Sequence, residues 1–384
     1  MLLIENSRSC AGKWLSKNRL WLCPREFTTL QGYSMQTDEN ILDLLQQKRA
    51  EVARNMLRGL ILQPGAIGDC ILTLPLAAYM KDCLELGSID ILGHTEYVGF
   101  LPGRSCIDGV SSMDAMELHR LFVEPGAFEL QDRDPLINTF SDYAWIVTFL
   151  GESESHFEQN LIFTANCSHS AEVMTLSLKP PQDCSEHVAD FYIRQFTERS
   201  GIFAEPRQTQ GDNCSIRAGQ ADVDAGRRLL TEAGVGFGGR LVVIQPGSGG
   251  QEKCWHIENF LTVAAGLASN GFEVVFLLGP AERERFSDET MSQTKGVAPC
   301  LADLPLTDVV ALLSCAHSFV GNDSGIAHLA GAMGVKTVVV FGPTDPAVYR
   351  PLGPAVTALA GCPSIFSNKP SAGLQRKLLD VLTA

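Results

Sequence analysis

The sequence predicts an α/β protein in which two Rossmann-like, doubly wound domains face each other across a cleft. The chain has 384 residues, beyond the size at which a single hydrophobic core keeps growing. Short apolar strands alternate with helical stretches, which is typical of parallel sheets. Two such series occur, and each carries glycine-rich or polar turns where its strands end. Those turns lie where open α/β sheets bind ligands.

The composition narrows the class of protein. The formal net charge of -14 at pH 7 argues against a nucleic-acid-binding surface and against general adhesion to anionic lipid. No apolar run reaches the roughly 18 residues that span a bilayer. The apolar patch at Trp21 is interrupted by Pro24 and Arg25, so we expect no cleaved signal peptide. The 12 cysteines form no C-x-x-C pair, which favours reduced, buried thiols in a cytoplasmic protein over a zinc site.

Four segments are expected along the chain. Residues 1–56 form an N-terminal extension, partly disordered, with helical apolar spacing at 38–56. Residues 57–200 and 216–384 form the two Rossmann-like domains, joined by a polar, turn-rich linker at 201–215. Met35 and Met56 each precede a plausible start of translation. We therefore hypothesise that part of the extension is an artefact of start-codon choice, which a native mass beginning at Met1 would refute.

The apolar runs place the individual elements. In the first domain we expect strands at 60–63, 89–92, 144–149, 161–164 and 173–178, and helices at 70–83 and 185–199. In the second we expect strands at 241–245, 273–278, 318–320 and 336–341, and helices at 221–233, 257–270, 307–315 and 375–382. A further short helix begins after Asn322, Asp323 and Ser324 and ends at Gly334.

A carboxylate follows the first strand of the first domain. The turn G-A-I-G-D ends at Asp69, where the pyrophosphate of a dinucleotide would need bare N–H groups. We therefore expect no nucleotide at this turn. Asp69 can be a helix-capping residue or a catalytic base, and its local sequence leaves both interpretations open.

Two turns of the second domain suit an anion. The turn P-G-S-G-G exposes backbone N–H groups, and Lys253 follows it. The Gly-Lys-Ser/Thr motif of P-loop nucleoside triphosphatases is absent. At the second turn, Asp323, Ser324 and Gly325 open a helix, and His328 lies one turn in, where it could donate to an anionic oxygen. A plain N-cap aspartate and a plain core histidine are the alternatives.

The unequal chemistry of the two domains predicts a group transfer with a nucleoside diphosphate as leaving group. Asp69 would take a proton from the acceptor hydroxyl, while Lys253 and the helix N-terminus stabilise the departing diphosphate. Neither glycine turn contains D-x-D, so we expect no metal.

Five motifs, in this order and spacing, resemble glycosyltransferase family nine, the ADP-heptose lipopolysaccharide heptosyltransferases. They occupy residues 65–75 (GAIGDCILTLP), 245–260 (QPGSGGQEKCWHIENF), 277–282 (LLGPAE), 321–330 (GNDSGIAHLA) and 341–346 (FGPTDP). The resemblance covers residue 57 to the C-terminus. The family usually has proline where this chain has His256.

The resemblance implies the GT-B fold, with residues 57–200 as the acceptor-side domain and 216–384 as the domain that binds the nucleotide-sugar donor. It implies an inverting transfer from a nucleotide sugar, ADP-heptose in most members, to a lipopolysaccharide core or related glycan acceptor. That acceptor can be lipid-linked. No cofactor is expected, and the enzyme would be cytoplasmic with peripheral contact at the inner membrane.

The resemblance also implies roles for individual residues. Asp69 falls on the general base, in the acceptor-side turn that contains Gly65 and Gly68. Lys253 and Ser248 fall beside the donor diphosphate. The remaining donor-binding positions are Glu282 (or Glu284, two residues on) near a ribose-binding acid, Leu306 near an adenine contact, and Asp323, Ser324, Gly325 and His328 in the D-[ST]-G-x-x-H segment.

Two other functions remain open at this point. A nucleotide-sugar epimerase of the GT-B fold would need a second acid or base in the cleft besides Asp69. A non-catalytic nucleotide-sugar-binding protein would keep Lys253 and Asp323 but tolerate the loss of Asp69.

Overall fold

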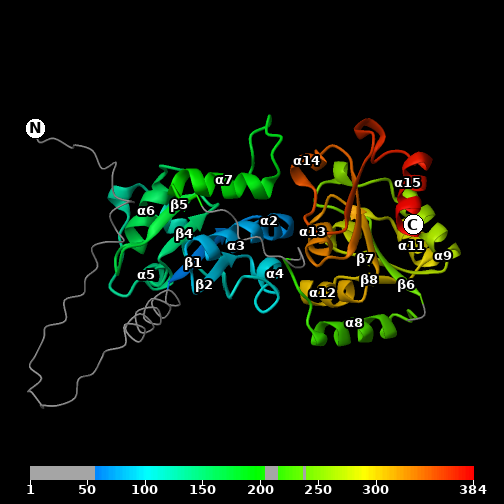
Figure 1. Cartoon of the computed structure of the whole chain (residues 1–384), viewed down its shortest axis with the longest axis horizontal. Coiled ribbons are helices and arrows are strands. Elements are labelled where there is room, and N and C mark those ends of the chain that lie inside the picture. Colours follow the sequence, from blue (N-terminus) through cyan, green and yellow to red (C-terminus); the bar gives the residue numbers. More distant parts are fainter. Residues whose placement is uncertain (1–56, 204–214, 237–238) are drawn as a thin grey trace, which may run out of the picture.

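The computed structural model describes residues 57–203, 215–236 and 239–384. The expected extension at 1–56, with its expected helix, and residues 204–214 of the expected linker lie outside the described residues. Two lobes stand side by side along the long axis of the molecule, each built around one sheet (Figure 1). The expectation of two α/β units is therefore confirmed.

The first lobe contains a five-stranded parallel sheet in the order β3-β2-β1-β4-β5. Its central strand, β1, is buried along five of its six residues because both faces carry helices, which is why its sequence is apolar without alternation. The strands are β1 (Arg58–Gln63), β2 (Ser88–Gly93), β3 (Gly109–Ser112), β4 (Trp145–Thr148) and β5 (Glu172–Thr175).

The second lobe contains a six-stranded parallel sheet in the order β11-β10-β9-β6-β7-β8. Strands β9 and β10 are almost wholly buried, and the apolar run at 336–341 forms β10 as expected. The strands are β6 (Arg240–Gln245), β7 (Phe272–Leu278), β8 (Cys300–Ala302), β9 (Ser318–Asn322), β10 (Lys336–Phe341) and β11 (Val356–Ala360).

Helices cover both sheets. In the first lobe they are α2 (Ile67–Leu72), α3 (Leu74–Cys83), α4 (Thr95–Val98), α5 (Pro135–Phe140), α6 (His156–Ala165) and α7 (Val188–Ser200), with the 3₁₀ turns η2 (Leu118–Phe122) and η3 (Pro125–Ala127). In the second they are α8 (Gln220–Glu232), α9 (Ile257–Ser269), α10 (Pro280–Arg285), α11 (Asp288–Val297), α12 (Leu306–Ser314), α13 (Gly325–Ala332), α14 (Pro346–Tyr349) and α15 (Ala372–Thr383), with η4 (Gln251–Lys253) and η5 (Pro363–Ile365).

Two local predictions for the first lobe are wrong. The apolar run at 161–164 lies inside α6 rather than in a strand. Ser155 caps that helix by accepting from the Glu158 N–H, a start signal that outweighs a short apolar run. The single helix expected at 70–83 is two helices, because Thr73 ends α2 and Pro75 occupies the first turn of α3.

The contacts between the lobes in the described ranges include three that bear on the site. Between the lobes, α2 and α13 point toward each other (Figure 1), and a Cβ added to Gly325 would lie 2.6 Å from the Ile67 Cβ. Arg104 forms a bidentate ion pair with Asp222 at the start of α8, with N–O distances of 3.0 and 2.6 Å. The ring of His187, which precedes α7, lies 2.9 Å from the Arg350 carbonyl oxygen.

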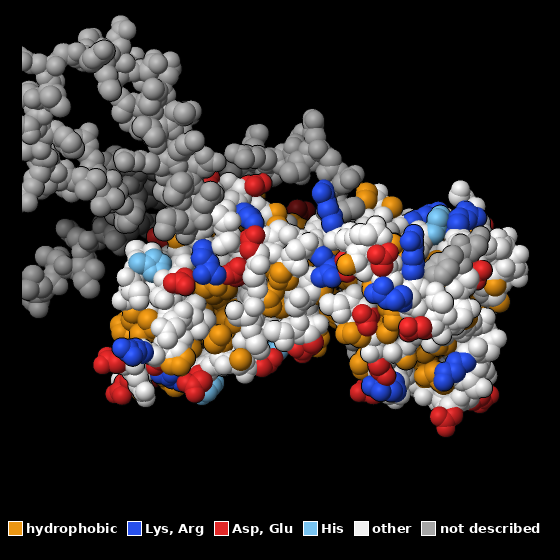
Figure 2. Space-filling model, turned by 90° about the horizontal axis from the view of Figure 1, so that it is seen from below, with side chains coloured by type: hydrophobic (Ala, Val, Ile, Leu, Met, Phe, Trp, Pro, Cys, Tyr) orange, Lys and Arg blue, Asp and Glu red, His pale blue; other side chains and the backbone are white. Residues whose placement is uncertain are grey.

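The face shown in Figure 2 narrows between the lobes, and its charged side chains of both signs are interspersed with apolar ones. Across the described ranges, no helix combines the length and apolar character needed to cross a membrane.

Candidate active site

Each sheet reverses its strand order at one point, and the predicted site residues gather at these two points. The chain runs from β1 outward to β2 and β3, then returns to the other side of β1 for β4 and β5. It does the same around β6, with β9 starting the return. The loops that leave the strands at such a point diverge and leave a crevice. Asp69 follows β1, Ser248 follows β6 and Asp323 follows β9.

Asp69 lies in the first turn of α2. Its Oδ2 accepts a hydrogen bond from the Ala66 N–H at 3.0 Å, so the carboxylate does stabilise the helix start. A glycine is required beside it, since a Cβ added to Gly65 would lie 2.6 Å from the Asp69 Cβ. In the described part of the chain, Oδ1 accepts no hydrogen bond. Capping and proton transfer therefore do not exclude each other here.

Electrostatics favour Asp69 as a proton acceptor. Burial raises the pKa of this carboxyl above its ordinary value, and the Ala66 N–H, His328, Lys179 and Lys253 offset the effect only in part. A carboxylate with a raised pKa binds a proton more readily than a solvated one. His328 and Lys253 belong to the second lobe, so their charges act on Asp69 across the cleft.

Asp323 organises the corresponding site in the second lobe. Its Oδ2 accepts from the Lys253 ammonium at 2.8 Å and from the Thr344 hydroxyl at 2.9 Å. Its backbone carbonyl accepts from the Ser248 hydroxyl at 2.6 Å, which ties the glycine turn to the end of β9. Burial would raise the pKa of Asp323, but His328 and Lys253 outweigh it and hold the pKa at about 2.

The structure corrects the expected capping role of Asp323. Ser324 is the N-cap of α13, and its hydroxyl oxygen accepts from the Ala327 N–H at 3.3 Å. The same hydroxyl donates to the Gln245 side chain at 2.8 Å. Asp323 is thus free to hold Lys253, which is 32% exposed and can still reach a ligand.

His328 is buried beside this cluster. Its Nε2 lies 3.8 Å from Asp323 Oδ1, and a Cβ added to Gly68 would lie 3.2 Å from its ring. Its buried Nδ1 has no hydrogen-bond partner among the described residues. Buried polar atoms normally have a partner, so this nitrogen is a candidate contact for a bound molecule or a water.

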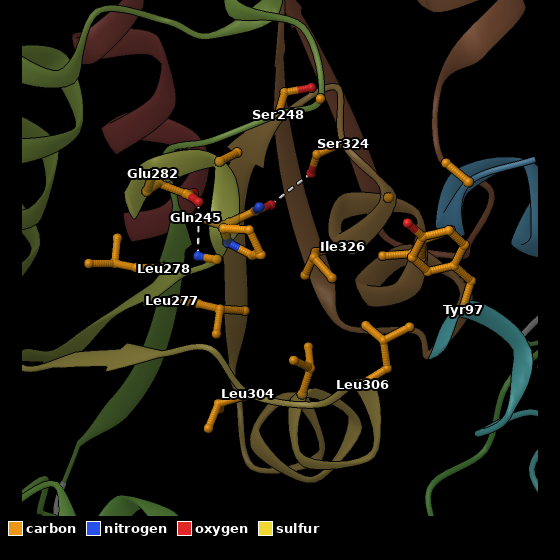
Figure 3. A pocket seen from close by; sticks show the side chains of 18 of the residues that line it. Tyr97, Gln245, Ser248, Leu277, Leu278, Glu282, Leu304, Leu306, Ser324 and Ile326 are labelled. Carbon is orange, nitrogen blue, oxygen red and sulfur yellow. Dashed lines mark hydrogen bonds between the residues drawn. The ribbon is translucent and has the colours of Figure 1, made fainter. Parts of the chain in front are cut away.

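A cavity of about 420 Å³ opens between the lobes beside this cluster, and Ser248 and Ser324 line it. Apolar side chains of the second lobe form most of its wall, and Tyr97 of α4 contributes from the first lobe, opposite Leu306 and Ile326 (Figure 3). An apolar wall with a few polar groups at one end suits the flat, apolar faces of a nucleobase.

Glu282 lines the cavity beside the glycine turn after β6 (Figure 3). It is 1% exposed, and its Oε2 accepts from the Gly279 N–H at 2.9 Å. Its buried Oε1 has no partner in the described chain, and burial raises the pKa of the carboxyl. The alternative acid, Glu284, is exposed and does not line the cavity. The geometry therefore favours Glu282 over Glu284.

The predicted residues fall into three groups. Ser248, Glu282, Leu306, Ser324, Gly325 and Gly68 line the cavity. Lys253, Asp323 and His328 form the adjoining charged cluster. Asp69 and Gly65 belong to the turn of the first lobe, outside the cavity wall.

Sequence reasoning missed the residues that hold these turns in place. Asn322 is fully buried, donates to the Pro246 carbonyl at 2.6 Å and accepts from the Trp255 N–H at 2.9 Å. Gln63 does the same for the first lobe, where its side chain accepts from Gly65 N–H and donates to the Thr73 hydroxyl. A buried amide at the last residue of a strand was the available signal.

Three side chains could hold a metal ion. The ligand atoms of His94, Glu96 and Asp114 lie within 4.8 Å of one another, and Glu96 also lines the cavity. His94 Nδ1 is 3.0 Å from Asp114 Oδ2, which is also a hydrogen-bond distance, and both acids are exposed. The spacing of these three residues along the chain did not predict this group.

Comparisons with known proteins give matches in sequence and in fold. The family described as "Glycosyltransferase family 9 (heptosyltransferase)" matches residues 203–373. A lipopolysaccharide heptosyltransferase 3 of Escherichia coli is 34% identical over 128 residues, which are 33% of this chain and 37% of that protein. The chain is heptosyltransferase-like.

Solved structures extend the likeness to the fold of both lobes. A family 9 glycosyl transferase of Veillonella parvula matches with a TM-score of 0.63 at 16% identity, over 85% of this chain and 98% of that one. The E. coli heptosyltransferase WaaC with ADP matches with a TM-score of 0.59 at 15% identity, over 85% and 100%. The expected GT-B fold is therefore confirmed. In sequence, the chain matches less than half the length of the curated relatives.

Proposed function

We propose that this chain is an inverting glycosyltransferase that moves a sugar, heptose from ADP-heptose, to a hydroxyl of a lipopolysaccharide core or related glycan acceptor. One observation carries the proposal. A carboxylate with a raised pKa in one lobe faces, across the α2–α13 contact, a lysine–aspartate–histidine cluster and a nucleoside-sized cavity in the other. That division suits a transfer with a diphosphate leaving group.

The reaction would proceed in one displacement. Asp69 accepts the proton of the acceptor hydroxyl as its oxygen attacks the anomeric carbon of the donor sugar. The bond from that carbon to the diphosphate oxygen breaks, and attack from the opposite face inverts the configuration. The proton ends on Asp69, and the negative charge ends on the nucleoside diphosphate.

The second lobe would stabilise that leaving group. Lys253 supplies a cation, the turn after β6 supplies backbone N–H groups, and the N-terminus of α13 adds its dipole. The unpartnered Nδ1 of His328 is a further candidate donor to a diphosphate oxygen. The nucleobase of the donor would occupy the apolar cavity beside Leu306, and Glu282 would lie at the ribose.

ADP as the nucleotide rests on similarity. One structure of the same fold carries ADP by its name, and the curated relatives are named lipopolysaccharide heptosyltransferases. A lipid-linked acceptor and peripheral contact with the inner membrane are proposed from the resemblance to the family alone. A metal is not required by the groups described, because Lys253 and the helix N-terminus already supply positive charge.

A thermal-shift screen of ADP, UDP, GDP and their sugars tests the donor assignment. A ligand that binds only the folded state raises the melting temperature, by an amount that grows with its concentration relative to Kd. We expect ADP and ADP-heptose to give the largest shifts. A protein stabilised by UDP or GDP and not by ADP would contradict the donor assignment, and one stabilised by none would contradict the proposed function.

A further inference from the structure

Arg285, the last residue of α10, contacts the glycine turn after β6 from the side opposite its free N–H groups. Its Nη1 donates to the Ser248 carbonyl at 2.8 Å, and its Nη2 donates to the Gly249 carbonyl at 2.7 Å. Nη1 also lies 3.5 Å from Cys254 Sγ. Among the described residues, no carboxylate lies within ion-pair distance of this guanidinium. Its two terminal nitrogens are therefore committed to the turn.

Two bonds from one guanidinium fix two successive peptide planes. In a trans peptide the C=O and the N–H point in opposite directions. The two carbonyls that Arg285 holds belong to the Ser248–Gly249 and Gly249–Gly250 peptides, so the N–H groups of Gly249 and Gly250 must point away from it. Neither N–H donates to a protein atom within the described ranges, and Gly249 lines the cavity.

The same helix also packs against the first glycine of the turn. Glu282 lies one turn before Arg285, and a Cβ added to Gly247 would lie 2.2 Å from its Oε1. The glycine turn is thus packed against Glu282 and held by Arg285, both from α10. Glycine is the most flexible residue type, so an unheld turn of this composition would sample many orientations of its N–H groups.

We propose that Arg285 is a positioning residue for the donor diphosphate. It does not touch the ligand, but it sets the orientation of the backbone N–H groups that do, and so lowers the entropy lost when a diphosphate binds. This inference rests on the proposed function, because it takes the turn after β6 as the diphosphate site. It assigns a role to a residue outside all five sequence motifs.

Three variants separate positioning from charge and from folding. Arg285→Gln removes the planar fork, and Arg285→Lys keeps the charge but cannot hold two carbonyls in a fixed geometry. The matched control is Arg283→Gln, on the same helix, whose side chain is 68% exposed and pairs with Asp303 instead of the turn. Melting temperatures show whether each variant is folded.

The readout is the ratio of ADP affinity to adenosine affinity, measured by calorimetry or competition. We expect Arg285→Gln to weaken ADP binding about tenfold, because the backbone N–H groups lose their fixed orientation, and to leave adenosine binding within about twofold. Arg285→Lys should resemble Arg285→Gln more than wild type, and Arg283→Gln should resemble wild type. In turnover, the KM for the donor should rise by more than kcat falls.

Several results would overturn the inference. Unchanged ADP affinity in Arg285→Gln would remove the positioning role. Equal losses of ADP and adenosine would indicate a general structural effect, and a wild-type-like Arg285→Lys would indicate charge alone. In each of these cases the proposed function still holds if the wild-type protein binds ADP. Wild-type protein that binds no ADP would overturn the donor assignment together with this inference.

Discussion

The two lobes share an architecture and differ in what their loops offer at the reversal point of the sheet. The turn after β1 presents the carboxylate of Asp69, and one of its oxygens accepts a hydrogen bond from the start of α2. The turns after β6 and β9 present a lysine, exposed backbone N–H groups and a helix N-terminus. The comparison teaches that one fold, used twice, gives one lobe suited to accept a proton and one suited to hold an anion.

The largest effect expected is on turnover after a change in the first lobe. Asp69→Asn keeps the shape of the side chain and removes its ability to take a proton. We expect turnover to fall by at least ~10²-fold, the lower range for a positioned base. Asp82→Asn, an exposed acid on α3, is the matched control and should remain active. An active Asp69→Asn would remove this residue from the mechanism.

A change in the second lobe should act on binding instead. Lys253→Ala removes a cation that pairs with Asp323, and we expect ADP affinity to fall by about 2 kcal/mol, as for a lost charge-assisted hydrogen bond. Lys295→Ala, an exposed lysine on α11, should leave ADP affinity unchanged. Calorimetry that finds equal affinity in Lys253→Ala and wild type would refute the assignment.

Asp323 should affect stability in a pH-dependent way. Its pKa is about 2 in the folded protein and 3.8 without the fold, so the ionised carboxylate stabilises the fold above about pH 4. That contribution is lost as the pH falls from 3.8 to about 2. We expect Asp323→Asn to lower the free energy of unfolding by about 2 kcal/mol at pH 7, and the difference from wild type to vanish near pH 2. A deficit that persists at acid pH would point to packing.

The contact between the lobes should show the smallest effect. A Cβ at position 325 would lie 2.6 Å from the Ile67 Cβ, so Gly325→Ala must push α2 and α13 apart. We expect a loss of about 1 kcal/mol of stability, the low end for overpacking, because short helix ends can shift. Gly373→Ala on α15, where an added Cβ meets nothing within 4 Å, is the control. Equal melting temperatures for both variants would show that the contact is loose.

The fold followed from the sequence because strand–helix alternation and turn chemistry are local. The run at 336–341 became β10, and the Asn322–Ser324 turn opened α13. The run at 161–164 failed because four apolar residues fit a buried helix face as well as a strand. The break at Thr73 was missed since Pro75 is tolerated within the first turn of a new helix.

The site was predicted less completely, because its supports come from residues far apart in the chain. Asp69, Lys253 and His328 carry chemistry that can be read from residue type. Asn322 bonds to a residue of the turn after β6 that is 76 positions away in the chain. Arg285 bonds to a residue of the same turn that is 36 positions away. For Arg285 nothing in the neighbouring residues predicts such a contact, and for Asn322 the signal is an amide at the last residue of a strand.

The central claim is that proton transfer and donor binding are separated between the lobes. The most direct test is a calorimetric titration of ADP into Asp69→Asn beside wild type. The account predicts equal affinities within about twofold, since the proposed mechanism assigns Asp69 to the acceptor and not to the diphosphate. A large loss of ADP affinity in Asp69→Asn would contradict it, because the carboxylate would then belong to the donor site.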